Sequence, residues 1–209
     1  MVRRIEKINR NKHTRKTRNI LLIAAEGNNK TESIYFSSFN QIQTSYRIQI
    51  AKGNKTDPKG IVEDMIKTIK NEQIDLKHGD IAICVFDADF GKYKSAQIDD
   101  AKLLASKHGI EIIISNPCFE VWFIEHFGYT TKNFNSNAEV IDELKEKIPN
   151  YTKSINLHPL IIDKTDIAIK NCKKLENFHD SIGNIGMCRN PSSEVYKIVE
   201  TINNKQKAF

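Results

Sequence analysis

The sequence has few cysteines and no long apolar run. Its four cysteines, Cys84, Cys118, Cys172 and Cys188, include no Cys-x-x-Cys pair, which argues against a zinc ribbon or a dithiol redox motif. The longest purely apolar runs, such as Ile20 to Ala25, have only six residues, far fewer than the roughly 20 that cross a bilayer as a helix. No secretory signal is recognisable either. We therefore expect a cytoplasmic protein that does not associate with a membrane.

Positive charge is concentrated at the start of the chain. Residues 1–19 contain eight lysines and arginines and one acidic residue, whereas the whole chain of 209 residues has a net charge of +6. The rest of the chain is therefore close to neutral, and its basic character belongs to an N-terminal arm. Such an arm suits salt-sensitive contacts with nucleic-acid phosphates, and it suits a solubilising tail equally well.

From Asn19 onward, apolar runs of strand length alternate with segments of helical character. The predicted strands are NILLIAA from Asn19, YRIQIAK from Tyr46, DIAICVF from Asp80 and IEIIIS from Ile110. The predicted helices between and after them are TESIYFSSFN, DPKGIVEDMIKTIKNEQ, SAQIDDAKLLASKHG and NPCFEVWFIEHF. Strands that alternate with helices are typical of a parallel sheet with right-handed crossovers, covered by helices on both faces.

Strand signals fade after Phe127, and three further segments are helical in pattern: NAEVIDELKEKI, DIAIKNCKKLENF and SSEVYKIVETINN. The segment SINLHPLIID between them is ambiguous. We therefore expect a basic arm over residues 1–18, an α/β core with about four parallel strands over residues 19–128, and a mainly helical extension over residues 129–209 that packs on the core. With 39% apolar residues, the chain can bury a sizeable core.

Acidic residues follow two of the predicted strands. Glu26 ends the first strand, and Asp87 and Asp89 end the third. Because the carboxyl ends of parallel strands meet at one edge of a sheet, these side chains come together if the two strands are neighbours. Carboxylates so close would repel each other and raise each other's pKa values, and a divalent cation removes that conflict. An all-oxygen site suits Mg²⁺ or Mn²⁺. A residue pair such as Asp87 and Asp89 can also cap a turn, and this structural alternative stays open.

These motifs resemble two known groups of proteins. The Glu-Gly after the first strand and the Asp-Ala-Asp after the third resemble the Toprim fold of topoisomerases, primases and related nucleases. The flanking segments RKTRNILLIAAEGNNKTESIYFSSF, CVFDADF, SNPCFEVWFIEHF and NPSSEVYKIVETI resemble the RloB-like family of bacterial phage-defence and abortive-infection proteins. That resemblance runs in order over nearly the whole chain, and it implies a Toprim-like, Rossmannoid three-layer α/β fold.

The resemblance implies roles for several residues. Asp87 and Asp89 would bind the cation, with Glu26 beside them as general acid or base. The family pattern is close to Glu-Gly-Glu-Lys-Thr-Glu, whereas this chain has EGNNKTE, one residue longer, with Asn28 after the glycine. Glu26 and Glu32 match the two ends of that pattern, and Glu32 is also placed to cap the following helix.

Further candidates stand close to these motifs in the sequence. Gly27 allows a close approach of the backbone to phosphate, and Lys30, Lys92, Lys94 and Arg189 can contact phosphate. Asn116 most simply caps the helix after the fourth strand, Glu120 lies in its first turns, where a carboxylate also gains from the helix dipole, and His126 shares its apolar stripe. Glu120 and His126 are candidate catalytic residues, and each has a purely structural interpretation beside it.

The predicted function is an Mg²⁺-dependent (or Mn²⁺-dependent) nuclease in antiphage defence, acting on RNA, by analogy tRNA, or on DNA, with an ATPase of the same system as a partner. Three alternatives remain. A haloacid-dehalogenase phosphatase carries its Asp-x-Asp after the first strand rather than the third, and a two-component receiver needs a fifth strand followed by lysine. The third alternative is a non-catalytic subunit that binds nucleic acid or regulates the ATPase. The sequence leaves self-association into a homo-oligomer open.

Overall fold

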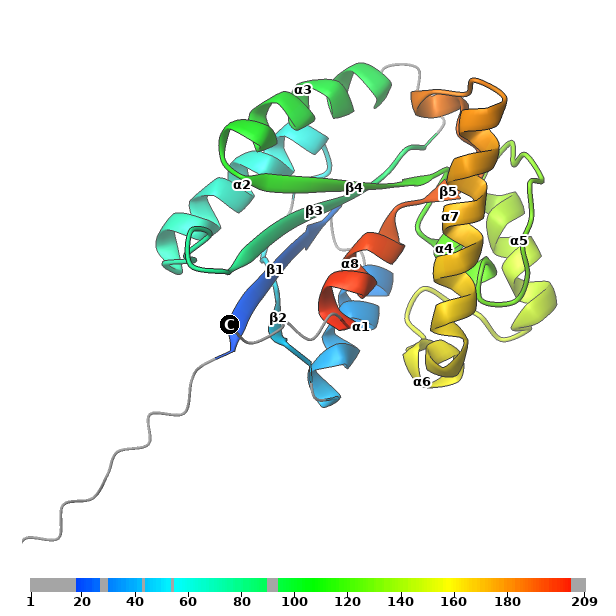
Figure 1. Cartoon of the computed structure of the whole chain (residues 1–209), viewed down its shortest axis with the longest axis horizontal. Helices are drawn as coiled ribbons and strands as arrows, with labels where there is room; N and C mark the ends of the chain where they lie inside the picture. Colours follow the sequence, from blue (N-terminus) through cyan, green and yellow to red (C-terminus); the bar gives the residue numbers. More distant parts are fainter. Residues whose placement is uncertain (1–17, 27–29, 43, 54, 90–93, 204–209) are drawn as a thin grey trace, which may run out of the picture.

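We analysed a computed structural model, which describes residues 18–203 apart from 27–29, 43, 54 and 90–93. The fold is mixed α/β, with a five-stranded, mostly parallel sheet (Figure 1). Its strands are β1 (Asn19–Ala25), β2 (Tyr46–Ile50), β3 (Ile81–Asp87), β4 (Ile110–Asn116) and β5 (Ser192–Ser193), in the order β2-β1-β3-β4-β5. The first four are parallel, as predicted, and β5 pairs antiparallel with β4. The fifth strand was not predicted.

The helices are α1 (Lys30–Ser38), α2 (Pro58–Asn71), α3 (Lys94–Lys107), α4 (Glu120–Ile124), α5 (Asn137–Lys147), α6 (His158–Ile161), α7 (Thr165–Ser181) and α8 (Val195–Asn203). Short 3-10 turns occupy Phe39–Gln41, Ile162–Lys164 and Gly186–Cys188. Local sequence explains several boundaries. Asp57 caps α2 by accepting a hydrogen bond from the Gly60 amide at 2.7 Å, with Pro58 in the first turn. Gly109 follows α3 with a φ of +67°, a backbone conformation that favours glycine.

The sheet separates two apolar clusters. On one face, Leu22 and Cys84 pack with α2 and α3. On the other face, Leu21 and Ile83 pack with α1, α4, α5, α7 and α8 (Figure 1). This alternation along β1 and β3 is expected for strands that are covered on both sides. Helices from residues 129–209, with Leu144 as an example, share one cluster with the strands.

The outer side of β2 and the far side of β4 are both covered by other groups, at least in part. At the β2 edge, the side chain of Asn40 donates to the Ile48 carbonyl at 2.8 Å and accepts from the Ile48 amide at 2.9 Å. At the β4 edge, β5 pairs with Ser115 and Asn116, and the Glu194 side chain accepts from the Ile114 amide at 3.0 Å. Side chains and a short strand therefore satisfy main-chain groups that an edge would otherwise expose.

Two sequence-based predictions of helix starts are wrong. The segment beginning at Asn116 was expected to be helical, but Asn116 is the last residue of β4, and α4 covers only Glu120–Ile124. Asn116 therefore does not cap that helix. The last helix was expected to begin at Ser192, which lies instead in β5. In the part of the chain that the structure describes, no helix is long and apolar enough to span a membrane.

Candidate functional site

The predicted carboxylates lie at the carboxyl edge of neighbouring strands. β1 and β3 are paired, with Ala25 opposite Val85, so Glu26 leaves the sheet beside Asp87 at the end of β3. Asp89 follows two residues later with a φ of +48°, and its amide donates to the Pro117 carbonyl at 3.0 Å. This turn redirects the chain after Asp87. The strand order therefore supplies the condition on which the predicted carboxylate cluster depended.

Two further glutamates join this group from the helices. Glu32 lies in the first turn of α1 and Glu120 is the first residue of α4; they are 4% and 1% exposed. Burial raises the pKa of Glu32 to about 7, and the nearby charges of Glu120 and Glu26 add to that rise. Glu32 is therefore part of the cluster rather than only a helix-capping residue. We call Glu26, Glu32, Asp87, Asp89 and Glu120 the carboxylate cluster.

Asp87 is at the electrostatic centre of the carboxylate cluster. Burial raises its pKa well above the ordinary value, and the charges of the other four members, Glu32, Glu120, Asp89 and Glu26, raise it further. Its Oδ1 atom is buried and has no hydrogen-bond partner among the described residues. A buried acceptor without a hydrogen bond lowers the stability of the folded state unless another group, such as a cation or a water molecule, binds it.

Lys94, the first residue of α3, partly neutralises the cluster. Its Nζ atom lies 2.5 Å from Glu26 Oε1 and 3.5 Å from Asp89 Oδ2. The Asn137 side-chain amide also donates to Asp89 Oδ1 at 2.9 Å. Burial raises the pKa of Glu26, while the hydrogen bond from Lys94 opposes that rise. In the structure Lys94 is an ion-pair partner of two carboxylates, and its predicted contact with nucleic acid stays a prediction.

Two residues close to Glu120 of the carboxylate cluster were not predicted from the sequence. The Tyr151 hydroxyl donates to Glu120 Oε1 at 2.9 Å, and Lys153 Nζ lies 3.8 Å from the same oxygen. Both lie in the irregular segment after α5, where no periodic pattern or motif marks a functional residue. Thr31 Oγ1 donates to the Lys153 carbonyl at 3.2 Å and joins this segment to α1. Only the folded chain brings these groups to Glu120.

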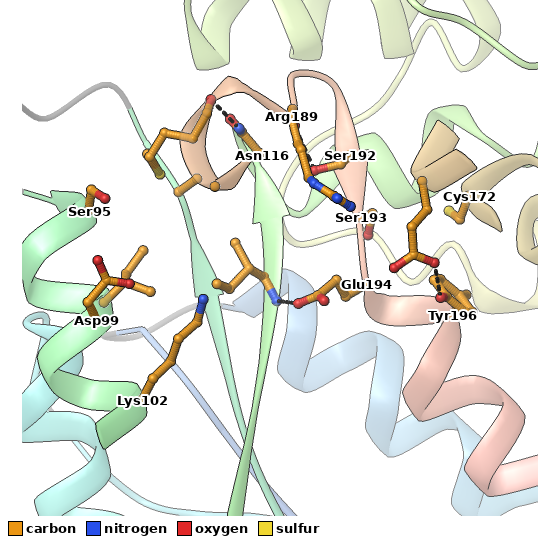
Figure 2. Close-up of a pocket in the computed structure, with 16 residues that line it drawn as sticks. Ser95, Asp99, Lys102, Asn116, Cys172, Arg189, Ser192, Ser193, Glu194 and Tyr196 are labelled. Carbon is orange, nitrogen blue, oxygen red and sulfur yellow. Dashed lines mark hydrogen bonds between the residues drawn. The ribbon is translucent and has the colours of Figure 1, made fainter. Parts of the chain in front are cut away.

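The other predicted phosphate contacts lie in different surroundings. Lys30 is exposed at the start of α1. Asn116 and Arg189 line a cavity of about 220 Å³ between α3, β4 and the segment around β5 (Figure 2). The Arg189 guanidinium already pairs with Asp180 and donates to the Asn184 carbonyl at 3.1 Å. Gly27 and Lys92 lie outside the described residues.

His126 is a buried residue, 1% exposed. Its Nδ1 atom lies 2.8 Å from the Trp122 carbonyl, and the two rings meet edge to face with centroids 4.6 Å apart. Burial lowers its pKa to about 4, so the ring is neutral at physiological pH. The nearby charges that affect it include Lys164 and His158. These contacts describe a packed core histidine, and its catalytic role stays a prediction.

The chemistry of the carboxylate cluster fits a hard divalent cation. All its donor atoms are carboxylate oxygens, and one of them, Asp87 Oδ1, has no hydrogen-bond partner among the residues described. As the side chains now stand, no three His, Cys, Asp or Glu residues within the described ranges are arranged to hold a metal ion. Two of the five acids, Glu26 and Asp89, are paired with the Lys94 ammonium group. A cation bound by these two carboxylates would compete with Lys94.

The fold and the site define an α/β protein with a buried carboxylate cluster at the carboxyl edge of a mostly parallel sheet. The chain belongs to the RloB-like family, since the family described as RloB-like protein matches residues 21–202. This match includes every member of the carboxylate cluster and the segment with Tyr151 and Lys153. Searches of the curated proteins and of the solved structures found no match.

Proposed function

We propose that this RloB-like protein is a metal-dependent nuclease with a Toprim-like core, and that the carboxylate cluster is its active site. The observation that carries the proposal is Asp87, a buried carboxylate at the carboxyl edge of β1 and β3 that is surrounded by four other acids. One of its oxygens has no hydrogen-bond partner within the described ranges. Perturbed carboxylates in this position are characteristic of functional sites. A structural role alone would not require five acids to be gathered at one point.

The residues divide into ligands and partners. Asp87 and Asp89 would hold Mg²⁺ or Mn²⁺, and Glu120 and Glu32 lie close enough to influence Asp87 electrostatically. The bound cation would neutralise phosphate charge and polarise the phosphorus–oxygen bond. Glu26 would exchange a proton with the attacking or the leaving oxygen. Lys94, released from Glu26, would pair with phosphate, while Tyr151 keeps Glu120 in place through its hydrogen bond.

The substrate and the cellular role follow from the family resemblance and from charge. The family resemblance supports action in bacterial antiphage defence beside an ATPase partner. The basic residues before residue 19 suit a polynucleotide, and RNA, including tRNA, is the proposed substrate, with DNA as the other candidate.

The test is cleavage of radiolabelled RNA and DNA by the full chain with and without Mg²⁺ or Mn²⁺. Wild-type protein should cut only when the metal is present. Asp87→Asn should lower the rate at least about a thousandfold, because a neutral amide is a much poorer ligand than a carboxylate. Asp142→Asn is the matched control, since Asp142 is an exposed acid on α5, and it should cut at the wild-type rate. Equal activity of wild type and Asp87→Asn would contradict the proposal.

One observation favours a second function, that of a non-catalytic nucleic-acid-binding or regulatory subunit. Lys94 already neutralises Glu26 and Asp89, as a purely structural cluster would require. Deletion of residues 1–18 separates the two functions. A binding subunit should lose affinity and its steep salt dependence, whereas a nuclease should keep metal-dependent turnover of short substrates.

A further inference from the structure

A second candidate site is formed in part by the sequence neighbours of the carboxylate cluster and of Lys94. The cavity of about 220 Å³ has Ala88 and Ser95 in its wall. Ala88 stands between Asp87 and Asp89, and Ser95 follows Lys94. The same turn and the same helix therefore position both the carboxylate cluster and this cavity. None of the five members of the carboxylate cluster lines the cavity itself, so the two sites are separate but share the segments that support them.

The size of the cavity limits what it can bind. Cavities for drug-sized ligands measure roughly 300–1,000 Å³, so a space of about 220 Å³ suits a single ring system. Part of the wall is apolar, formed by Ile98 on α3, Ile114 on β4 and Met187. Apolar side chains of this kind can pack against the face of a nucleobase.

The polar groups of the cavity favour hydrogen-bond donors. Asn116 is 4% exposed, and its Nδ2 atom donates to the Met187 carbonyl at 2.9 Å. Its amide oxygen has no hydrogen bond to other described residues, which leaves an acceptor at the cavity. On the opposite side, Ser95, Asp99 and Lys102 come from one face of α3 (Figure 2). In the described part of the chain, Asp99 forms no ion pair within 4 Å, so its carboxylate is a second acceptor.

The charge of the lining disfavours an anion. Three acids, Asp99, Glu176 and Glu194, line the cavity with two cations, Lys102 and Arg189. The Arg189 guanidinium is already paired with Asp180, Glu194 pairs with Lys197 at 2.6 Å, and Glu176 accepts from the Tyr196 hydroxyl at 2.7 Å. The lining therefore offers no excess of cations to a phosphate group, whereas a neutral ring that carries an amino group would find acceptors in Asp99 and Asn116. Aspartate and asparagine oxygens are the usual acceptors for the exocyclic amino groups of cytosine and adenine.

We infer that this cavity binds a nucleobase with an exocyclic amino group, supplied by the single strand whose phosphate lies at the carboxylate cluster. The inference rests on the proposed function for the source of the base, but the binding of the base itself does not require cleavage. Enzymes that act on single-stranded or unstacked nucleic acid commonly place a base in such a recess. The cavity would then give the protein a base preference beside the cleaved bond.

The test uses the full chain without metal, so that binding is measured apart from any cleavage. Adenosine, cytidine and uridine are titrated while protein amide signals are followed by NMR. Adenosine and cytidine should bind about tenfold more tightly than uridine, which has no exocyclic amino group. Asp99→Ala should weaken adenosine binding about three- to tenfold. Asp100→Ala is the control, because Asp100 is the next exposed acid on α3 and does not line the cavity.

A second pair of variants tests the location without removing a hydrogen bond. Ser95→Trp should fill the cavity and abolish adenosine binding, whereas Gln97→Trp, at an exposed position on the same helix outside the cavity, should not. The inference fails if no nucleoside binds, if uridine binds as well as adenosine, or if the control variants weaken binding as much as Asp99→Ala and Ser95→Trp.

A displacement experiment identifies the source of the base. A single-stranded oligoadenylate should displace adenosine, and an oligouridylate of equal length should do so about tenfold less well. If neither displaces adenosine, the occupant is a free nucleoside or nucleotide, and the assignment to the bound strand is overturned. Nucleoside binding without any metal-dependent cleavage would contradict the nuclease proposal and leave the base-binding cavity in place.

Discussion

Replacing Lys94 by methionine gives a sharp test of how the carboxylate cluster is balanced. The ammonium group lies 2.5 Å from Glu26 and 3.5 Å from Asp89, and the side chains of Lys94 and Glu26 are only 10% and 14% exposed. Removing one partner of such a pair leaves a poorly solvated charge, which costs roughly 3 kcal/mol at the low end of measured values. For a chain of 209 residues, we expect the Tm to fall by roughly 6–12 °C.

The loss of stability should depend on pH in a defined direction. Burial already raises the pKa of Glu26 in the folded protein, and without Lys94 this pKa rises further. A carboxyl group with a raised pKa in the folded state destabilises the fold when it ionises, so the deficit is largest at high pH. It should shrink as the pH falls, because Glu26 then takes up a proton.

Thermal melts over a series of decreasing pH values, with and without Mg²⁺, measure these effects. If a cation and Lys94 compete for the same carboxylates, Mg²⁺ should raise the Tm of Lys94→Met more than that of wild type. Lys107→Met is the control, because Lys107 is an exposed lysine at the end of the same helix. A deficit that neither acid nor Mg²⁺ reduces would refute the reasoning, as would a variant with the stability of wild type.

Two further predictions concern the interior. Glu125 is fully buried, and its pKa is raised to about 8 by burial; the folded state therefore keeps a proton that the unfolded state loses near its ordinary pKa. Urea denaturation should show stability that falls as the pH rises from about 5 to about 8. Glu125→Gln should remove the part of this slope that Glu125 contributes, while the raised pKa values of Glu32 and Asp87 leave the rest. Leu144→Ala should lower the free energy of unfolding by roughly 2–5 kcal/mol. Because Leu144 shares an apolar cluster with Leu21 of the sheet, unfolding should remain a single transition when it is followed by circular dichroism and by tryptophan fluorescence. Two separate transitions would contradict a common core.

The four parallel strands could be predicted because each is a short apolar run between helical segments. Their observed bounds differ from the expected ones by at most two residues, as at β2, which ends at Ile50 rather than Lys52. β5 could not be predicted, because it has only two residues and forms through its pairing with β4. The start of α4 was also missed. Asn116 and Pro117 are typical of a helix start, but Asn116 pairs with Ser192 as a strand residue.

The site was predictable where it depends on strand ends and unpredictable where it depends on distant loops. Glu26 and Asp87 follow apolar runs, so the parallel sheet alone brings them to one edge. Lys94 lies close in sequence, but only the packing of α3 shows that it pairs with Glu26. Tyr151 and Lys153 reach Glu120 from an irregular segment. No periodicity encodes such a contact.

The occupied edges of the sheet have a consequence for how copies of this protein could meet. A strand from a second molecule would have to displace the Asn40 side chain at β2, or β5 and Glu194 at β4. Either displacement would sacrifice hydrogen bonds before any new ones formed. The pairing of a strand from a second molecule with β2 or with β4 is therefore disfavoured.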